Sequence, residues 1–246
     1  MRGGLCLRLL TLVGLTVALA AVYGVAAPLW EGTDEPIHFD FVKYVVDHGR
    51  LPTLYDEGAI LGQTLQPPLY YVLGALLVRG IPTDDLEEMR VMNPYFYTLG
   101  MGTEDAYAVH SEAERFPWKG TARAVHWLRL FTALWGGATV VAAYLIGREQ
   151  WPRAVAPALG TAAIVGLTPG FIHLNSYVTN DAPSVALTAW TIWAALRLVR
   201  LGPSRARFAA VGGLLGLSLL AKQTALFLLP VVGGILGWLA FERRSW

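Results

Sequence analysis

Cysteine and charged residues are scarce in this chain of 246 residues, and each scarcity excludes a class of protein. A single cysteine, Cys6, cannot build a disulfide framework. Charged residues make up 15% of the chain, whereas a soluble domain has about 25%. The net charge of +1 is small, so we expect no nucleic-acid partner. Nine Trp, ten Tyr and nine Phe exclude a disordered chain.

Hydrophobic residues account for 54% of the sequence and are gathered in long runs. A run of roughly 18 apolar residues or more crosses the hydrocarbon core as a helix. The sequence therefore predicts an all-α integral membrane protein with about six transmembrane helices and a tight turn at Ala221-Lys222-Gln223. The predicted spans are 5–27, 125–146, 154–173, 183–199, 208–220 and 224–241.

The first run is interpreted as an uncleaved signal anchor, because it is longer than a signal-peptide core and Pro28 would follow the cut. The N-terminus and the segments after the second, fourth and sixth predicted spans carry ten basic and two acidic residues. The positive-inside rule places these segments in the cytoplasm. We expect a plasma-membrane protein with a cytoplasmic N-terminus. Its predicted parts are a first transmembrane helix (1–27), an extracytoplasmic loop (28–122) and transmembrane helices two to six (123–246).

The extracytoplasmic loop has 15 acidic and 6 basic residues and is rich in aromatic side chains. Loops this long are usually functional or disordered, and the aromatic content argues for function. Two interfacial helices are predicted within it, at 36–48 and at 70–78. Glu35 is the expected N-cap of the first, whose Phe39 and Val42 are expected to lie on the bilayer surface.

The strongest chemical signal is the acidic pair Asp34-Glu35 followed by His38, just outside the first span. A carboxylate near the membrane boundary is partly desolvated, which raises its pKa and suits it to general-base catalysis. Helix capping is the structural alternative. A metal site formed by these three residues is a weaker one, because no second ligand cluster follows. We expect no cofactor.

The order of these motifs resembles the GT-C superfamily of membrane glycosyltransferases. It is most similar to the branch of protein O-mannosyltransferases and lipid A aminoarabinose transferases. The resemblance spans almost the whole chain, and each motif is short. The matching residues are Asp34-Glu35 with His38, Gly49-Arg50-Leu51-Pro52, Gln66-Pro67-Pro68-Leu69-Tyr70-Tyr71, Arg129-Leu130, Asn180-Asp181, and Gly216-Leu217 through Ala221-Lys222-Gln223-Thr224 to Pro230.

The resemblance implies transfer of a sugar from a polyprenyl-phosphate donor to a lipid, glycan or protein hydroxyl at the outer face of the membrane. The family's catalytic base maps onto Asp34 and a second acidic residue onto Asp181, and Glu35 is kept as a further catalytic candidate. Gln66 stands where the aminoarabinose branch has a phosphate-binding Lys. Family members have further spans, so the chain is interpreted as a fragment or truncated product, and activity of the chain alone is a question for experiment.

Two cations are candidates for binding the donor phosphate, Lys222 between the last two spans and Arg129 inside the second. Each has a structural alternative, since long basic side chains also snorkel to the membrane surface. Asp181 has helix capping as its alternative. His38 and Gln66 complete the predicted substrate-binding set. The competing functional hypothesis is a non-enzymatic membrane protein, either half of a transporter or a lipid-binding scaffold. It is less favoured because the polar residues gather at one surface and no repeat is apparent.

Overall fold

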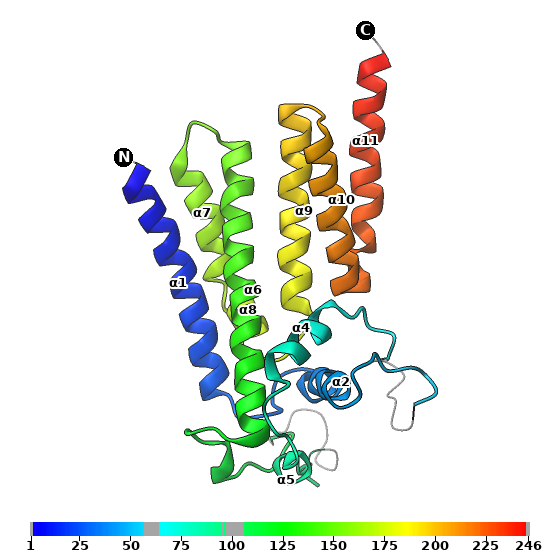
Figure 1. The fold of residues 1–246 in the computed structure, drawn as a ribbon. Helices are drawn as coiled ribbons and strands as arrows, with labels where there is room; N and C mark the ends of the chain where they lie inside the picture. The colour runs from blue at the N-terminus through cyan, green and yellow to red at the C-terminus, as the bar shows by residue number, and fades with distance from the viewer. Residues whose placement is uncertain (1, 57–63, 95, 97–105, 245–246) are drawn as a thin grey trace.

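The computed structural model describes residues 2–56, 64–94, 96 and 106–244 (Figure 1). Within these ranges it is helical and has no strand, only an isolated antiparallel bridge between Met92 and Ala108. The prediction of an all-α protein is confirmed. The α-helices are α1 (Arg2–Ala26), α2 (Glu35–His48), α4 (Leu69–Val78), α5 (Leu86–Met89), α6 (Gly120–Gln150), α7 (Val155–Gly166), α8 (Pro169–Leu174), α9 (Asp181–Leu201), α10 (Arg205–Ala221) and α11 (Leu228–Arg244), with short 3-10 helices at Glu112–Glu114 and Gln223–Phe227.

In the described part of the chain, α1, α6, α7, α9, α10 and α11 form an antiparallel bundle (Figure 1). Four segments are long and apolar enough to cross a membrane, as judged by length and composition alone. They are Leu5–Ala26, Gly120–Gln150, Asp181–Leu201 and Gln223–Phe241. The others are shorter, with 12 residues in α7 and 17 in α10.

The third predicted span, 154–173, is not one continuous helix. The helix α7 ends at Gly166, and Pro169 begins α8 after two non-helical residues. Proline has no amide hydrogen and disfavours helical geometry in the residue before it, so a helix ends there and a new one starts with proline in its first turn. The predicted turn at Ala221-Lys222-Gln223 is confirmed, since α10 ends at Ala221 and a 3-10 helix follows Lys222.

Small residues let the long helices approach one another closely. A Cβ atom built on Gly147 of α6 would lie 2.7 Å from the Cα atom of Ala158 on α7, so only glycine fits at this crossing. The hydroxyl of Thr16 on α1 donates to the carbonyl of Gly166, at 3.2 Å. Close backbone approach and interhelical hydrogen bonds are the usual means by which helices associate in lipid.

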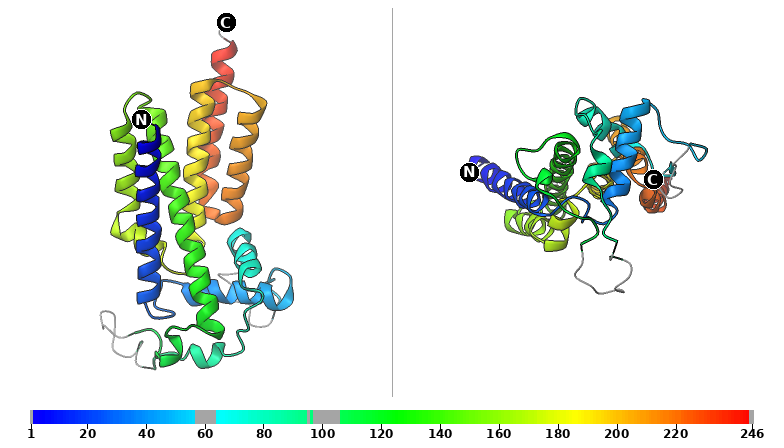
Figure 2. Two further views of the ribbon diagram at one scale, coloured as in Figure 1. Left: turned by 60° about the vertical axis from the view of Figure 1, so that its left-hand side comes forward. Right: turned by 90° about the horizontal axis from the view of Figure 1, so that it is seen from below.

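The two ends of the bundle differ in character. The connections from α6 to α7 and from α9 to α10 lie at the same end as both chain termini, whereas α2, α4 and α5 lie at the other end (Figures 1 and 2). Arg148, Arg153, Arg205 and Arg207 lie in or directly beside these two connections. The structure thus separates the basic connections from the acidic loop, as the sequence predicts. The assignment of the basic end to the cytoplasm stays a prediction.

The helices α2 and α4 form a small core with the beginning of α6. Phe39 and Val42 of α2 are fully buried in it, together with Tyr71 of α4 and Leu128 of α6. The prediction that Phe39 and Val42 lie on the bilayer surface is therefore wrong. The sequence pattern identifies the apolar face of α2 correctly, but that face packs against protein.

Candidate functional site

A buried ion pair between Arg129 of α6 and Glu35 of α2 organises the acidic end of the molecule. The Nε atom of Arg129 donates to Oε1 of Glu35 at 2.8 Å, and Nη2 donates to Oε2 at 2.6 Å. The other guanidinium donors reach the carbonyls of Gly24, Ala27 and Pro28 at 2.7, 2.7 and 2.9 Å. All five N–H donors of this arginine are therefore used within the protein.

The carboxylate of Glu35 also fixes two stretches of backbone. It accepts hydrogen bonds from the amides of Trp30 at 3.0 Å and of Val178, in the connection before α9, at 2.9 Å. Glu35 is 0% exposed and Arg129 is 3% exposed. The end of α1, the start of α2, the α6 helix and the connection before α9 thus meet at one buried pair. We call this pair the Glu35–Arg129 lock.

The residue before the lock, Asp34, is exposed. It occupies the N-cap position of α2, yet its side chain makes no capping hydrogen bond. Its backbone is left-handed, with φ of 58° and ψ of 9°, a conformation that aspartate and asparagine adopt more readily than most residues. The prediction of Glu35 as the N-cap is wrong by one residue, and capping does not account for the Asp34 carboxylate.

A second ion pair joins the beginning of α9 to the end of α10. The Nζ atom of Lys222 lies 2.5 Å from Oδ1 of Asp181, and the two side chains are 22% and 40% exposed. The neighbouring Asn180 donates to Oε1 of Gln66 at 3.1 Å, and its own side chain does not cap α9. The snorkelling alternative for Lys222 is therefore replaced by a partly exposed ion pair beside Gln66.

The imidazole of His38 lies between these groups. Its Nδ1 atom is 2.8 Å from the hydroxyl of Tyr71. Burial lowers the pKa of His38 from 6.5 to about 4, with the cation of Lys222 acting in the same direction and the carboxylates of Asp34, Asp181 and Glu35 opposing it. His38 is consequently neutral at pH 7. All four charges are therefore near enough to act on this one ring.

The structure separates the predicted site residues into two groups. Glu35 and Arg129 are enclosed in the lock, so Arg129 neither snorkels nor presents a free donor to phosphate. The other five are linked to one another: Lys222 pairs with Asp181, Gln66 is bonded to the neighbouring Asn180, and the charges of Asp34, Asp181 and Lys222 act on His38.

Two tyrosines near these residues are not among the predicted site residues. Tyr71 belongs to the Gln-Pro-Pro-Leu-Tyr-Tyr motif, which offers a signal in the sequence. Tyr177 has no comparable signal. It packs against the acidic turn, where a Cβ atom built on Gly32 would lie 2.6 Å from the Cβ atom of Tyr177. Burial raises the pKa of Tyr177, and the charges of Asp181 and Asp34 add to that effect.

In the residues that the structure describes, no group of three or more His, Cys, Asp or Glu side chains converges on a metal position. Asp34, Glu35 and His38 do not form a metal-ligand set together, because Glu35 is bound by Arg129 and His38 contacts Tyr71. The absence of a cofactor stays a prediction.

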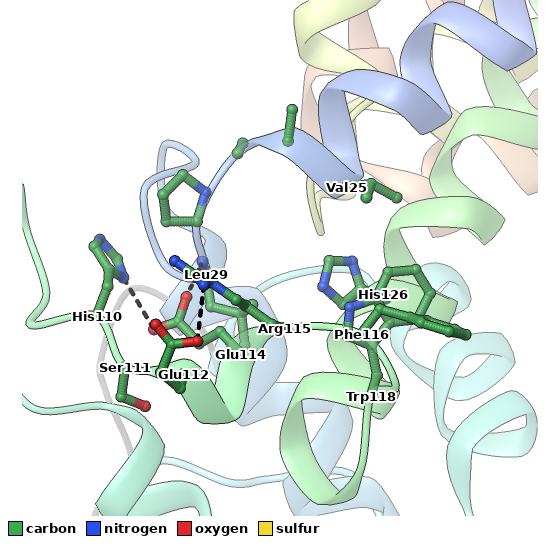
Figure 3. Close-up of a pocket in the computed structure, with 13 residues that line it drawn as sticks. Val25, Leu29, His110, Ser111, Glu112, Glu114, Arg115, Phe116, Trp118 and His126 are labelled. Carbon is green, nitrogen blue, oxygen red and sulfur yellow. Dashed lines mark hydrogen bonds and ion pairs between the residues drawn. The ribbon is translucent and has the colours of Figure 1, made fainter.

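A separate pocket of about 650 Å³ lies beside the end of α1, and none of the predicted site residues lines it (Figure 3). One wall is aromatic, with Trp118 stacked on His126 at 3.9 Å between ring centroids. The other wall carries His110, whose Nδ1 atom is 3.0 Å from Glu114 and whose Nε2 atom is 3.0 Å from Glu31.

The fold and the site together define a class, that of a helical membrane protein with a carboxylate site at one end of its bundle. Residues 124–246, half of the chain, match the family model of dolichyl-phosphate-mannose-protein mannosyltransferase. The chain belongs to this family, which is a GT-C type of glycosyltransferase. The match includes Arg129, Asp181 and Lys222, and the turn with Asp34 precedes it. No curated protein and no solved structure matches the chain.

Proposed function

We propose that the protein transfers a sugar from a polyprenyl-phosphate donor to an acceptor hydroxyl of a lipid, glycan or protein at the extracytoplasmic face of the plasma membrane, with Asp34 as general base. The observation that carries the proposal is the geometry of Asp34. Its carboxylate is exposed and makes no cap, and it adjoins a buried lock that fixes the backbone on either side of it. Because the lock holds the backbone beside Asp34 in place, the carboxylate needs little ordering before it accepts a proton.

In the proposed reaction, an oxygen of Asp34 takes the proton of the acceptor hydroxyl while the hydroxyl oxygen attacks the anomeric carbon of the donor. The bond from that carbon to the phosphate oxygen breaks, and polyprenyl phosphate leaves with the bonding electron pair. Attack from the side opposite the leaving group inverts the configuration of the sugar.

Lys222 balances the negative charge that develops on the departing phosphate. Preorganised cations of this kind stabilise a transition state strongly, because they need no rearrangement during the reaction. Asp181 holds the ammonium group at 2.5 Å and acts as a positioning residue for it. His38 is neutral, so it contacts the substrate as a hydrogen-bonding group, and Gln66 is held by Asn180, the residue before Asp181. The roles of Glu35 and Arg129 are to hold the acidic turn.

The experiment that tests this function is sugar transfer by the full-length protein in liposomes. Mannosyl polyprenyl phosphate is the first donor to try, because mannose is the sugar in the family's description. The expected result is a glycosylated acceptor of inverted configuration together with free polyprenyl phosphate. Retained configuration would contradict the single displacement, and failure to transfer sugar from any polyprenyl-phosphate donor would contradict the function.

A further inference from the structure

The pocket beside the end of α1 takes no part in the proposed mechanism. Its volume of about 650 Å³ lies within the range of roughly 300–1,000 Å³ that is typical of small-molecule sites. Figure 3 shows its two walls, with Phe116 and Trp118 on one side and His110 and Glu112 on the other. The pocket lies at the end of the bundle that is expected to be extracytoplasmic, so a ligand would enter it from outside the cell.

The aromatic wall is both exposed and held in place. The ring of Phe116 is 79% exposed and meets Trp118 edge to face, with ring centroids 5.5 Å apart. Trp118 is in turn stacked on His126, which belongs to the first turns of α6. An aromatic ring fixed in this way offers an apolar surface to a ligand at a low cost in ordering.

The opposite wall is polar and is fixed by the acidic turn. Oε2 of Glu114 accepts a hydrogen bond from the amide of Leu29 at 3.1 Å, and its Oε1 contacts Nδ1 of His110. The other ring nitrogen of His110 contacts Glu31, which also accepts hydrogen bonds from two backbone amides. Both walls are therefore preformed.

The charged side chains that line the pocket already have partners within the protein. Nη1 of Arg115 lies 2.8 Å from Oε2 of Glu112, and these two side chains are 75% and 80% exposed. An ionic ligand would have to displace such partners. A hydroxyl group can instead use the remaining lone pairs and N–H groups, because a carboxylate accepts about four hydrogen bonds and a guanidinium donates five. The charge pattern thus favours a neutral ligand with several hydroxyls.

A hydrocarbon chain does not suit the pocket, since it would remove these charged groups from water. A sugar ring matches both walls, because its C–H face is apolar and its edge carries hydroxyl groups. We propose that this pocket is a binding site for a short neutral saccharide, separate from the site at Asp34. The inference goes beyond the proposed function and does not depend on it, because none of the proposed site residues lines the pocket.

The test measures binding of neutral mono-, di- and trisaccharides to the full-length protein in nanodiscs, first on a glycan array and then by calorimetry with the best-binding glycan. We expect saturable binding of at least one of them. Its Kd should change little between about 0.1 and 1 M salt, because the ligand forms no ion pair. Failure of every neutral glycan to bind, or a Kd that rises steeply with salt, would overturn the proposal.

Phe116→Ala removes the exposed aromatic surface and should weaken binding by about tenfold, with little change in Tm because the ring is mostly exposed. Tyr55→Ala is the matched control. Tyr55 is an aromatic residue that is 97% exposed and does not line the pocket, so this variant should bind as the wild type does. Unchanged binding in Phe116→Ala, or an equal loss in both variants, would exclude the pocket as the site.

A photoactivatable derivative of the same glycan locates the site directly. Cross-linked peptides, identified by mass spectrometry, should come from residues 110–118 and from the end of α1. Cross-links found only in α2 and at the beginning of α9 would place the glycan at the site of Asp34 instead, and the proposal of a second saccharide site would be wrong.

Discussion

Arg129 and Glu35 are 94 positions apart in the sequence, and the guanidinium of the first holds both carboxylate oxygens of the second. The pair lies on the protein side of the acidic turn, and Asp34 lies on its exposed side. Two adjacent carboxylates thus have different surroundings. Glu35 is buried and paired, so it stabilises the turn, whereas Asp34 is exposed and is the one we propose as the base.

The lock should dominate the stability of this end of the molecule. Arg129→Met leaves the Glu35 carboxylate buried without its partner, which costs about 3–5 kcal/mol. Thermal unfolding in detergent should show a large drop in Tm. Arg90→Met is the control, because the Arg90–Asp40 pair at 2.6 Å is partly exposed at 25% and 28%. Removing it should cost no more than about 1 kcal/mol. Equal losses of Tm in Arg129→Met and Arg90→Met would show that the buried lock contributes no more to stability than a partly exposed ion pair.

Lys222 should act on the donor rather than on the fold. Lys222→Met removes the cation proposed to face the phosphate, so kcat/KM should fall by about tenfold or more with little change in Tm. Lys222→Arg keeps the charge and should recover a large part of the activity. Lys43→Met is the matched control, since Lys43 forms an exposed pair with Asp47. A normal kcat/KM for Lys222→Met would remove this residue from the mechanism.

The stability of the protein should depend on pH through His38. Its pKa is about 4 in the folded protein, whereas in the unfolded chain it is near 6.5. As the pH falls, His38 takes up a proton in the unfolded chain before it does so in the folded protein. The stability that the neutral, buried His38 contributes is therefore complete above about pH 6.5 and is lost as the pH falls towards 4. Tm should therefore decrease over that window in the wild-type protein. His38→Gln, which retains a hydrogen-bonding group towards Tyr71, should flatten the profile, and an unchanged slope would contradict the assignment.

The orientation in the membrane follows from the basic connections and is open to direct test. In a Cys6→Ser background, Ser111→Cys should react with an impermeant thiol reagent in intact cells. Arg205→Cys should react only after the membrane is permeabilised, since its connection is expected to be cytoplasmic. Labelling of Arg205→Cys from outside would reverse the predicted topology.

Much of this architecture is predictable from local sequence. The apolar runs identify the long helices because a helix in lipid must be apolar around most of its circumference. The break before Pro169 follows from proline's backbone geometry, which a hydropathy pattern alone does not register. The burial of Phe39 depends on which surface α2 meets, and hydropathy does not distinguish lipid from a protein neighbour. Motif order predicts that Asp34, Asp181 and Lys222 belong to one site, and the structure pairs Lys222 with Asp181.

The family resemblance assigns the base to Asp34, but the burial of Glu35 in an ion pair with Arg129 is not predictable from the sequence. Asp34 and Glu35 are chemically similar neighbours, and either could serve as a base. Only the three-dimensional contact with Arg129 and the amide of Val178 decides which one is buried. Tyr177 likewise reaches the site only because Gly32 admits its ring, a contact between residues far apart in the chain.

The most direct test of the account is the kcat of Asp34→Asn in the full-length protein, measured with a polyprenyl-phosphate sugar donor in liposomes. Asparagine preserves size and tolerates a left-handed backbone, but it cannot accept the proton. We predict that kcat falls by about 10²–10⁴-fold, with donor KM and Tm nearly unchanged, while the exposed-carboxylate control Asp84→Asn behaves as wild type. Near-normal turnover by Asp34→Asn would contradict its role as the base.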